Sequence, residues 1–483
     1  MTAGLLEDWV AQRGRSMPAA EAVLADGASL TYRELNGRVR GLAGALRARG
    51  VASGDRVALL GQNSLEFVVA LHGIPRAGAI CVPLNTRLTL EELAFQLRDA
   101  GVQILLTDAV LEERARAAAG ASGVREVVRL PVAGDEAGDL VEVHSPEDVH
   151  SIVYTSGTTG SPRGSMLTFG NIWASATASA FNLGVLPGDR WLACMPLFHV
   201  GGMAIVLRSA IYGTSLVVHE GFDERRVVAS IHEDRITTVS VVATMLHRML
   251  DADERKAPPW LRTVLVGGGP VPLPLLERAA DRGYPVIQTY GLTEAASQVA
   301  TLAPGDAMGH LGSAGKPLLN TRIRIDAPDG EPGEILVAGP TITPGYFRQP
   351  EATAAAIRDG WLHTGDIGRL DDDGFLYVLD RRDDLIVSGG ENVYPAEVEA
   401  ALVAHPAISG AAVVGLADER LGQMVAAAIV LSQDVEDAEI GTFLRGRIAG
   451  YKLPRRLMRV EELPQTANGK VLRRVVRALF GSE

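Results

Sequence analysis

The chain has 483 residues, and 46 Lys and Arg against 58 Asp and Glu give it a net charge of −12. At roughly 150 residues per domain, this length excludes a single small module. Hydrophobic residues make up 47% and charged residues 22%, a globular composition that excludes a disordered or fibrous chain. The acidic balance argues against nucleic acid as the main partner.

The sequence contains two cysteines, Cys81 and Cys194, too few for a disulfide framework or a four-thiolate zinc site. Both stand in apolar stretches, so we expect buried thiols. The first residues lack the basic and apolar regions of a signal peptide, and no apolar run reaches the roughly 18 residues that span a membrane. We therefore expect a cytoplasmic protein without a membrane partner.

Helix and strand signals alternate along the chain, which is typical of an α/β fold with a largely parallel, covered sheet. Thr31 and Glu34 form a capping-box pattern before a helix at 35–49. Further helices are expected at 65–77 and 90–99. Apolar runs predict strands at 55–60, 79–84, 103–107, 190–195, 215–218, 239–242, 263–267 and 285–289. An acidic, weakly patterned stretch at 135–146 predicts a surface connection.

From residue 321 the pattern changes to short strands separated by Gly, Pro and Asp, as in a small antiparallel sheet or barrel. These strands are predicted at 322–325, 333–337 and 375–379. A second unit is predicted from helices at 395–405 and 436–448 and from strands at 411–416 and 425–431. The stretch 445–477 holds ten Arg or Lys and two Glu, which indicates either a solvated helix face or a patch that meets ligand phosphates.

The sharpest chemical signal is Tyr154-Thr-Ser-Gly-Thr-Thr-Gly-Ser-Pro-Arg-Gly164, which follows an apolar strand at 151–154. Its glycines permit close backbone approach, and its N–H groups, hydroxyls and Arg163 can surround phosphate oxygens. It is not a Walker A loop, because the chain has no G-x-x-x-x-G-K-[ST]. By composition alone, a flexible surface loop is the alternative.

The order of these residues resembles the phosphate-loop signature of the adenylate-forming superfamily, which includes acyl- and aryl-CoA synthetases, adenylation domains and luciferases. The superfamily's motifs follow in order along nearly the whole chain. The resemblance implies the adenylate-forming fold and the use of ATP, Mg²⁺ and CoA. Arg163 stands where the superfamily commonly has Lys, so details of pyrophosphate handling are expected to differ. The loop residues implied in ATP binding are Thr155, Ser156, Gly157, Thr158, Thr159, Gly160 and Arg163.

A second motif, Tyr290-Gly-Leu-Thr-Glu294, resembles the superfamily's Y-G-x-T-E. The resemblance implies that Tyr290 stacks on adenine beside Gly291, that Thr293 meets the α-phosphate and that Glu294 helps to hold Mg²⁺. A carboxylate suits this hard cation. On its own, Glu294 would read as a solvated acid at a helix start.

Two further motifs concern the nucleotide. Thr364-Gly-Asp366 resembles the T-G-D motif, which implies that Asp366 accepts hydrogen bonds from the ribose hydroxyls, and Arg381 matches an arginine that reaches the same ribose. The turn that contains Gly268 and Gly269 is not G-x-G-x-x-G, so a dinucleotide fold is not supported. The resemblance places these glycines between adenine and the acyl pocket, whereas an ordinary strand-end turn is the alternative.

The C-terminal motifs imply a mobile small domain. Lys470, in a P-x-x-x-x-G-K pattern, would be the catalytic lysine of the first half-reaction, where its charge offsets charge that builds in the transition state. Asp383 matches the hinge position. We predict an N-terminal domain at 1–380, a hinge at 381–384 and a C-terminal domain at 385–483. The residues implied in CoA binding are Ser388, Gly389, Gly390, Glu391 and Asn392.

His199 follows an apolar strand, where a lone histidine is usually a satisfied core residue. The resemblance instead places it at the border of the acyl pocket, which it would gate. The chain has no H-E-x-x-H, zinc spacing or G-x-S-x-G elbow. The residues implied in the acid pocket are His199, Gly268, Leu292, Ser297 and Gln298.

Three stretches, at 168–184, 239–250 and 288–317, are similar to the o-succinylbenzoate–CoA ligases of menaquinone biosynthesis. The second carboxylate of that acid needs a polar or cationic partner, which Ser297, Gln298 or Arg87 would supply. The alternatives are another acyl- or aryl-CoA ligase for benzoate, coumarate or a medium-chain acid, an adenylation domain that loads a carrier protein, and a silent nucleotide-binding protein. The expected partners are the acid, ATP and CoA, and a homodimer is left open.

Overall fold

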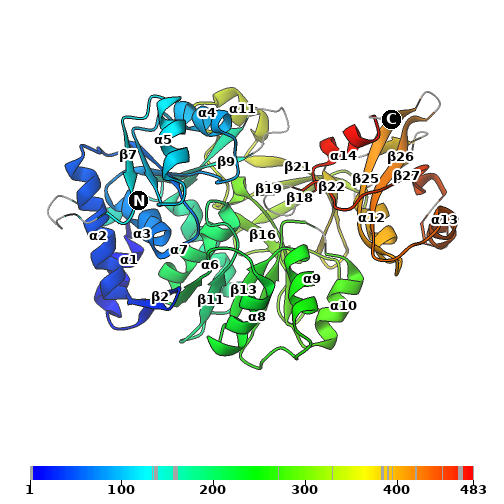
Figure 1. The fold of residues 1–483 in the computed structure, drawn as a ribbon, viewed down its shortest axis with the longest axis horizontal. Coiled ribbons are helices and arrows are strands. Elements are labelled where there is room, and N and C mark those ends of the chain that lie inside the picture. Colours follow the sequence, from blue (N-terminus) through cyan, green and yellow to red (C-terminus); the bar gives the residue numbers. More distant parts are fainter. Residues whose placement is uncertain are drawn as a thin grey trace.

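The structure, a computed structural model, describes residues 4–132, 134, 140–155, 162–269, 271–328, 330–381, 384, 386–388, 391–393, 395–418, 421–445, 447, 448, 450–465 and 471–481. The chain folds into two large sheet-and-helix layers, a small antiparallel sheet and a C-terminal α+β unit, which lies at the right of Figure 1. This architecture confirms the predicted α/β fold. No helix among the described residues is long and apolar enough to cross a membrane.

The first sheet has the strand order β10-β9-β5-β4-β6-β7. Its strands run parallel except at one edge, where β10 is antiparallel to β9. Along β4, Val57 and Leu59 enter one apolar core while Ala58 and Leu60 enter another, because successive side chains point to opposite, covered faces. The elements are α2 (Tyr32–Ala48), β4 (Arg56–Leu60), α3 (Leu65–Arg76), β5 (Ile80–Pro83), α4 (Leu90–Ala100), β6 (Ile104–Thr107), α5 (Glu112–Gly120), β7 (Glu126–Arg129), β9 (Val149–Thr155) and β10 (Arg163–Thr168).

The capping box predicted before the first long helix is present. The Thr31 side chain accepts from the Glu34 N–H, and the Glu34 carboxylate accepts from the Thr31 N–H at 2.8 Å. This cap begins α2 at Tyr32 rather than at residue 35.

The second sheet has the order β17-β16-β15-β14-β13-β11-β12-β2-β3. Its central strands β15, β14, β13, β11, β12 and β2 are parallel, and β16 turns back antiparallel to β15. The hairpin of β2 and β3, which the sequence analysis missed, extends one edge. The elements are β2 (Glu21–Ala25), β3 (Ala28–Thr31), α6 (Phe169–Leu183), β11 (Arg190–Ala193), α7 (Val200–Tyr212), β12 (Ser215–Val218), α8 (Glu224–Glu233), β13 (Thr238–Val241), α9 (Ala243–Ala252), β14 (Thr263–Val266), α10 (Leu273–Asp281), β15 (Val286–Leu292), η1 (Thr293–Ala295), β16 (Ser297–Thr301) and β17 (Lys316–Pro317).

A small antiparallel sheet follows, as the sequence predicted, in the order β18-β19-β21-β20 with β22 paired to β21. The motif at 364–366 lies inside the long strand β21, where Gly365 has a positive φ of 71°. The elements are β18 (Arg322–Asp326), β19 (Gly333–Ala338), α11 (Pro350–Ala356), β20 (Ile357–Arg358), β21 (Trp361–Leu370) and β22 (Leu376–Arg381).

The C-terminal unit builds its own core around Val398, Val413, Val425 and Ile429. Its sheet has the order β24-β23-β26-β25, with β27 paired to β26. The two predicted helices are present but shorter at their C-terminal ends. The elements are β23 (Ile386–Ser388), β24 (Glu391–Val393), α12 (Pro395–Val403), β25 (Ile408–Asp418), β26 (Gly422–Leu431), α13 (Asp437–Arg445), η3 (Gly450–Lys452), β27 (Arg456–Arg459) and α14 (Arg473–Leu479).

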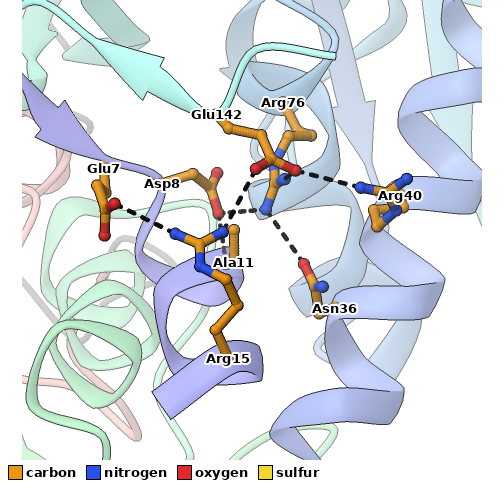
Figure 2. A network of polar contacts seen from close by, with 8 residues as sticks. All are labelled: Glu7, Asp8, Ala11, Arg15, Asn36, Arg40, Arg76 and Glu142. Atoms are coloured by element: carbon orange, nitrogen blue, oxygen red, sulfur yellow. Dashed lines mark hydrogen bonds and ion pairs between the residues drawn. The ribbon is translucent and has the colours of Figure 1, made fainter. Parts of the chain in front are cut away.

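A buried arginine ties three distant segments together at the N-terminal end (Figure 2). The Arg76 side chain is 0% exposed, and its guanidinium contacts Asp8 Oδ1 at 2.6 Å, Glu142 Oε1 at 3.0 Å and Asn36 Oδ1 at 3.2 Å. Asp8 also caps α1 (Trp9–Ser16) by accepting from the Ala11 N–H. The described end of the predicted surface connection therefore joins the fold, and its strand β8 (Val143–His144) pairs with β1 (Leu6–Glu7).

Candidate active site

The candidate site forms where strands of both large sheets end. The turn of Gly268 follows β14, and the 290–294 motif ends the neighbouring parallel strand β15, so both lie at the carboxyl edge of one sheet, where α/β proteins bind ligands. Thr155 ends β9 of the other sheet, and its hydroxyl donates to Glu294 Oε1 at 3.4 Å. The structure thus places Thr155, the first of the predicted phosphate-loop residues, in contact with the predicted metal-binding carboxylate.

The Glu294 carboxylate is held by groups from a third segment. The Tyr346 hydroxyl donates to Glu294 Oε1 at 3.0 Å, and the Thr343 N–H donates to the Glu294 backbone carbonyl at 2.7 Å. Burial, and then the Glu294 charge, raise the pKa of Tyr346 well above its usual value, so its hydroxyl is a donor at neutral pH. Neither Thr343 nor Tyr346 was predicted from the sequence.

Two predicted nucleotide residues meet on neighbouring elements. The Tyr290 hydroxyl donates to Asp366 Oδ2 at 2.6 Å, and both side chains are buried. Asp366 on β21 pairs in register with Arg381 on β22, of which only the backbone is described. An aromatic ring and a buried carboxylate therefore lie side by side, an arrangement that suits a nucleoside.

Two glycines of the site are required by backbone geometry. A Cβ on Gly291 would come within 1.7 Å of the Ser297 carbonyl oxygen, so the tight return from β15 to β16 excludes any side chain. Gly268 has a φ of +82°, which favours glycine over residues with a Cβ.

His199 begins α7 directly after the loop that leaves β11. Asn63 braces this loop: its Oδ1 accepts the Leu197 N–H at 2.9 Å, and its Nδ2 donates to the Met195 carbonyl at 2.8 Å. Burial, and then the charge of Arg87, lower the pKa of His199 to about 4, so its ring is neutral at pH 7. Within the described residues its Nε2 is buried without a hydrogen-bond partner, as expected for an atom that meets a ligand.

Ser297 and Gln298, the two polar residues predicted after the 290–294 motif, are constrained in different ways. Ser297 has a φ of +97° and directly follows Ala296 at +50°, so this turn is held in a sparsely populated backbone conformation. Gln298 is 2% exposed, and its Nε2 donates to Thr301 Oγ1 at 3.0 Å. Its Oε1 has no partner in the described part of the chain. Through this amide oxygen, Gln298 can still accept a hydrogen bond from a ligand.

Several predicted site residues lie outside the described residues. Ser388 is buried on β23 and pairs with Glu391 of β24, so the described residues of the predicted CoA loop belong to the C-terminal sheet. Nothing is described of the Glu391 and Asn392 side chains. The predicted residues outside the described ranges are Ser156, Gly157, Thr158, Thr159, Gly160, Asp383, Gly389, Gly390 and Lys470.

The Glu294 carboxylate fits Mg²⁺, because carboxylate oxygens are hard ligands that this cation prefers. Its Oε1 accepts hydrogen bonds from the Thr155 and Tyr346 hydroxyls. No cluster of three or more His, Cys, Asp or Glu that could hold a metal occurs in the described residues.

Residues 9–347 match the AMP-binding enzyme family, and residues 397–470 match the AMP-binding enzyme C-terminal domain. The 2-succinylbenzoate–CoA ligase of Bacillus mycoides is 43% identical to this chain over 480 residues, which cover 98% of each protein.

The o-succinylbenzoate CoA synthetase of Bacillus subtilis is 40% identical and is known in several complexes. With its acyl-adenylate intermediate it gives a TM-score of 0.92 and 98% coverage of both chains. With ATP and a magnesium ion the TM-score is 0.91, with coverages of 98% of this chain and 99% of that one. A double mutant bound to a product analogue gives only 0.76 at the same coverages. The chain therefore belongs to the AMP-binding enzyme family, among its 2-succinylbenzoate–CoA ligases.

Proposed function

We propose that this enzyme joins o-succinylbenzoate to CoA through an acyl-adenylate, with release of AMP and pyrophosphate. The observation that carries the proposal is the meeting of Thr155, Glu294 and the Tyr290–Asp366 pair around the ends of β9 and β15. In this proposal Thr155 begins the phosphate loop, Glu294 is the metal-binding carboxylate, and Tyr290 with Asp366 forms the nucleoside contact. The similarity to 2-succinylbenzoate–CoA ligases supports the choice of acid.

In the first step, a carboxylate oxygen of the acid attacks the α-phosphorus of ATP, and the bond to the pyrophosphate oxygen breaks. Bound Mg²⁺ would neutralise phosphate charge. Thr155 and Arg163 hold phosphate oxygens, Asp366 holds the ribose, and Lys470 approaches from the small domain to stabilise the charge that develops on the α-phosphate. Catalysis then rests on positioning and charge.

The acid would lie between the turn at Gly268 and the start of α7. The His199 Nε2, which has no hydrogen-bond partner within the described residues, would make a polar contact with an oxygen of the acid, and Gln298 would line the pocket beside it. The distal carboxylate would face Arg87, because that cation is close enough to His199 to lower the histidine's pKa. A long-chain fatty acid would leave these polar atoms unpaired. Leu292 and Ser297 complete the proposed pocket.

In the second step, the CoA thiol attacks the acyl carbonyl and AMP leaves. We propose that the small domain rotates about Asp383 between the steps, which withdraws Lys470 and brings the 388–392 loop to the site. Strand pairing supports this boundary, since β22 ends at Arg381 in the small antiparallel sheet and β23 starts in another sheet. The TM-scores of 0.92 and 0.76 for two complexes of one relative support such a change of arrangement.

The remaining parts of the proposal concern the cellular compartment and the oligomeric state of the enzyme. Cys81 and Cys194 are both free and buried, which suits a reducing cytoplasm. A homodimer stays a prediction.

Acid-dependent ATP–pyrophosphate exchange tests the choice of acid. We expect rapid exchange with o-succinylbenzoate, slow exchange with benzoate or octanoate, and loss of exchange in Glu294→Gln. Rapid exchange with benzoate or octanoate alone would replace the proposed acid with another. Exchange followed by transfer to a carrier protein but not to free CoA would indicate a carrier-loading adenylation domain.

A further inference from the structure

Both side-chain hydrogen bonds to the Glu294 carboxylate from the described residues end on the same oxygen, Oε1. The donors are the hydroxyls of Tyr346 at 3.0 Å and of Thr155 at 3.4 Å. Thr155 belongs to the predicted phosphate loop, whereas Tyr346 stands in none of the motifs identified in the sequence. Two donors on one oxygen restrict the rotation of the carboxylate, and neither occupies its second oxygen, Oε2.

Tyr346 is itself fixed by the backbone around it. It forms an antiparallel bridge with Ser165 of β10, and its N–H donates to Thr353 Oγ1 at 2.9 Å. The next residue, Phe347, donates its N–H to the Gly164 carbonyl at 2.8 Å. The side chain is 9% exposed. Its hydroxyl is therefore delivered to Glu294 by a buried ring on a fixed backbone.

Tyr346 also contacts the arginine of the predicted phosphate loop. The Arg163 guanidinium lies over the Tyr346 ring, with its central carbon 5.5 Å from the ring centroid. A planar guanidinium stacks on an aromatic face in a way that a lysine ammonium does not. Tyr346 thus contacts a proposed phosphate-binding cation with both its ring and its hydroxyl, and the proposed metal-binding carboxylate with its hydroxyl.

We propose that Tyr346 is a positioning residue for metal-dependent ATP binding, acting by orienting the Glu294 carboxylate toward Mg²⁺. The inference rests on the proposed function, because it assumes that Glu294 binds the metal that accompanies ATP. Hydrogen-bond partners of metal ligands commonly contribute about 10- to 100-fold to metal affinity or activity. A residue that only packed the core would affect ATP binding equally with and without metal.

The test is Tyr346→Phe, which removes the hydroxyl and keeps the ring under Arg163. ATP binding is measured by calorimetry with Mg²⁺ and, separately, with EDTA. We expect the affinity to fall about tenfold with Mg²⁺ and to stay unchanged in EDTA. The Mg²⁺ concentration that gives half-maximal pyrophosphate exchange should rise by a similar factor. Tyr212→Phe is the matched control, because it removes a buried tyrosine hydroxyl that donates to the Ala176 carbonyl at 2.6 Å.

Equal weakening in Mg²⁺ and EDTA, or no weakening in either, would overturn the positioning role. The melting temperature of Tyr346→Phe should match that of Tyr212→Phe, which separates a folding defect from a metal effect. Glu294→Gln separates a failure of the positioning role of Tyr346 from a failure of the proposed function. If Glu294→Gln raises the Mg²⁺ requirement and Tyr346→Phe does not, only the positioning role fails. If the unaltered enzyme shows no Mg²⁺-dependent binding of ATP, the proposed function fails.

Discussion

At the scale of single residues, the buried Asp366 carboxylate leads to a specific prediction about the binding of ATP. It accepts a short hydrogen bond from Tyr290 and is expected to receive the ribose hydroxyls as well. Asp366→Asn removes a charged acceptor, and hydrogen bonds to charged groups contribute about 1.5–3 kcal/mol, so KM for ATP should rise roughly 10- to 100-fold.

Pyrophosphate exchange at varied ATP measures this change. Asp371→Asn is the control, since Asp371 caps the turn between β21 and β22 by accepting from the Phe375 N–H at 2.8 Å. An unchanged KM in Asp366→Asn would remove this residue from the ribose site.

The site residues that were predicted from the sequence stand in short motifs, in which other polar or glycine residues of the same site lie within a few positions. Thr155, Tyr290, Glu294 and Asp366 are of this kind, and the structure brings them into two contacting pairs. Tyr346 could not be found in this way, because its partner Glu294 is 52 residues away. A single buried tyrosine carries no local pattern that distinguishes a hydrogen-bond donor in a site from a core side chain.

At the scale of elements, helix α6 holds the segment that carries Tyr346. Asn171 on α6 donates from Nδ2 to the carbonyls of Pro340 at 2.8 Å and Ile342 at 2.9 Å, and its Oδ1 accepts the Thr168 N–H. Asn171→Ala leaves these backbone groups unpaired, so the free energy of unfolding should fall by about 1–3 kcal/mol. The Mg²⁺ requirement for pyrophosphate exchange should also rise, because Tyr346 lies four residues after Ile342 in the segment that Asn171 holds.

Urea unfolding and Mg²⁺ titration measure the two effects. Asn182→Ala is a control on the same helix, because Asn182 makes one hydrogen bond, to the Leu302 carbonyl at 3.0 Å. Its effects on the Mg²⁺ requirement and on the free energy of unfolding should both be smaller than those of Asn171→Ala. Equal effects of the two variants would contradict the bracing role of Asn171.

Elements that are buried on both faces were predicted well, and elements with mixed surroundings were not. The prediction of β12 at 215–218 is correct at both ends, because a run of apolar residues needs no partner to be recognised. Strand β21 was missed, since Thr364, Gly365 and Asp366 serve the site and interrupt its alternation. The hairpin of β2 and β3 was also missed, although Asp26-Gly27 is a recognised hairpin turn.

At the scale of the whole molecule, the Arg76 network joins the N-terminal segment to the first sheet unit. Its guanidinium is fully buried between Asp8 and Glu142. Arg76→Met leaves the Asp8 carboxylate buried without its cation, and breaking such a pair costs about 3–5 kcal/mol of the free energy of unfolding.

Denaturant unfolding measures this loss. The control is Arg116→Met, which breaks an exposed pair with Glu112 and should cost less than about 1 kcal/mol. Similar losses in the two variants would show that Arg76 is not a structural anchor.

Buried histidines near this network predict a pH dependence of stability. Burial, and then the charges of His72 and His144, lower the pKa of His150 to about 3, and burial lowers the pKa of His72 to about 4. Their unfolded pKa is about 6.5, so below that pH the unfolded chain binds more protons than the folded one. Stability should therefore fall as the pH drops from about 6.5 toward 4, by up to about 1.4 kcal/mol per pH unit for each histidine.

Urea unfolding between about pH 5 and 7.5 in the unaltered chain and in His150→Gln tests this origin, because the unfolded pKa of about 6.5 falls in that window and the folded values lie below it. The variant should lose stability with a shallower slope. Identical slopes would assign the dependence to other groups.

The most direct test of the account is the formation of AMP and a CoA thioester from o-succinylbenzoate, ATP, Mg²⁺ and CoA. The account predicts rapid formation of o-succinylbenzoyl-CoA with one AMP for each thioester. Lys470→Ala should lose adenylate formation but should still transfer the acyl group when o-succinylbenzoyl-AMP and CoA are supplied. Absence of AMP and thioester with o-succinylbenzoate in the unaltered enzyme would contradict the account.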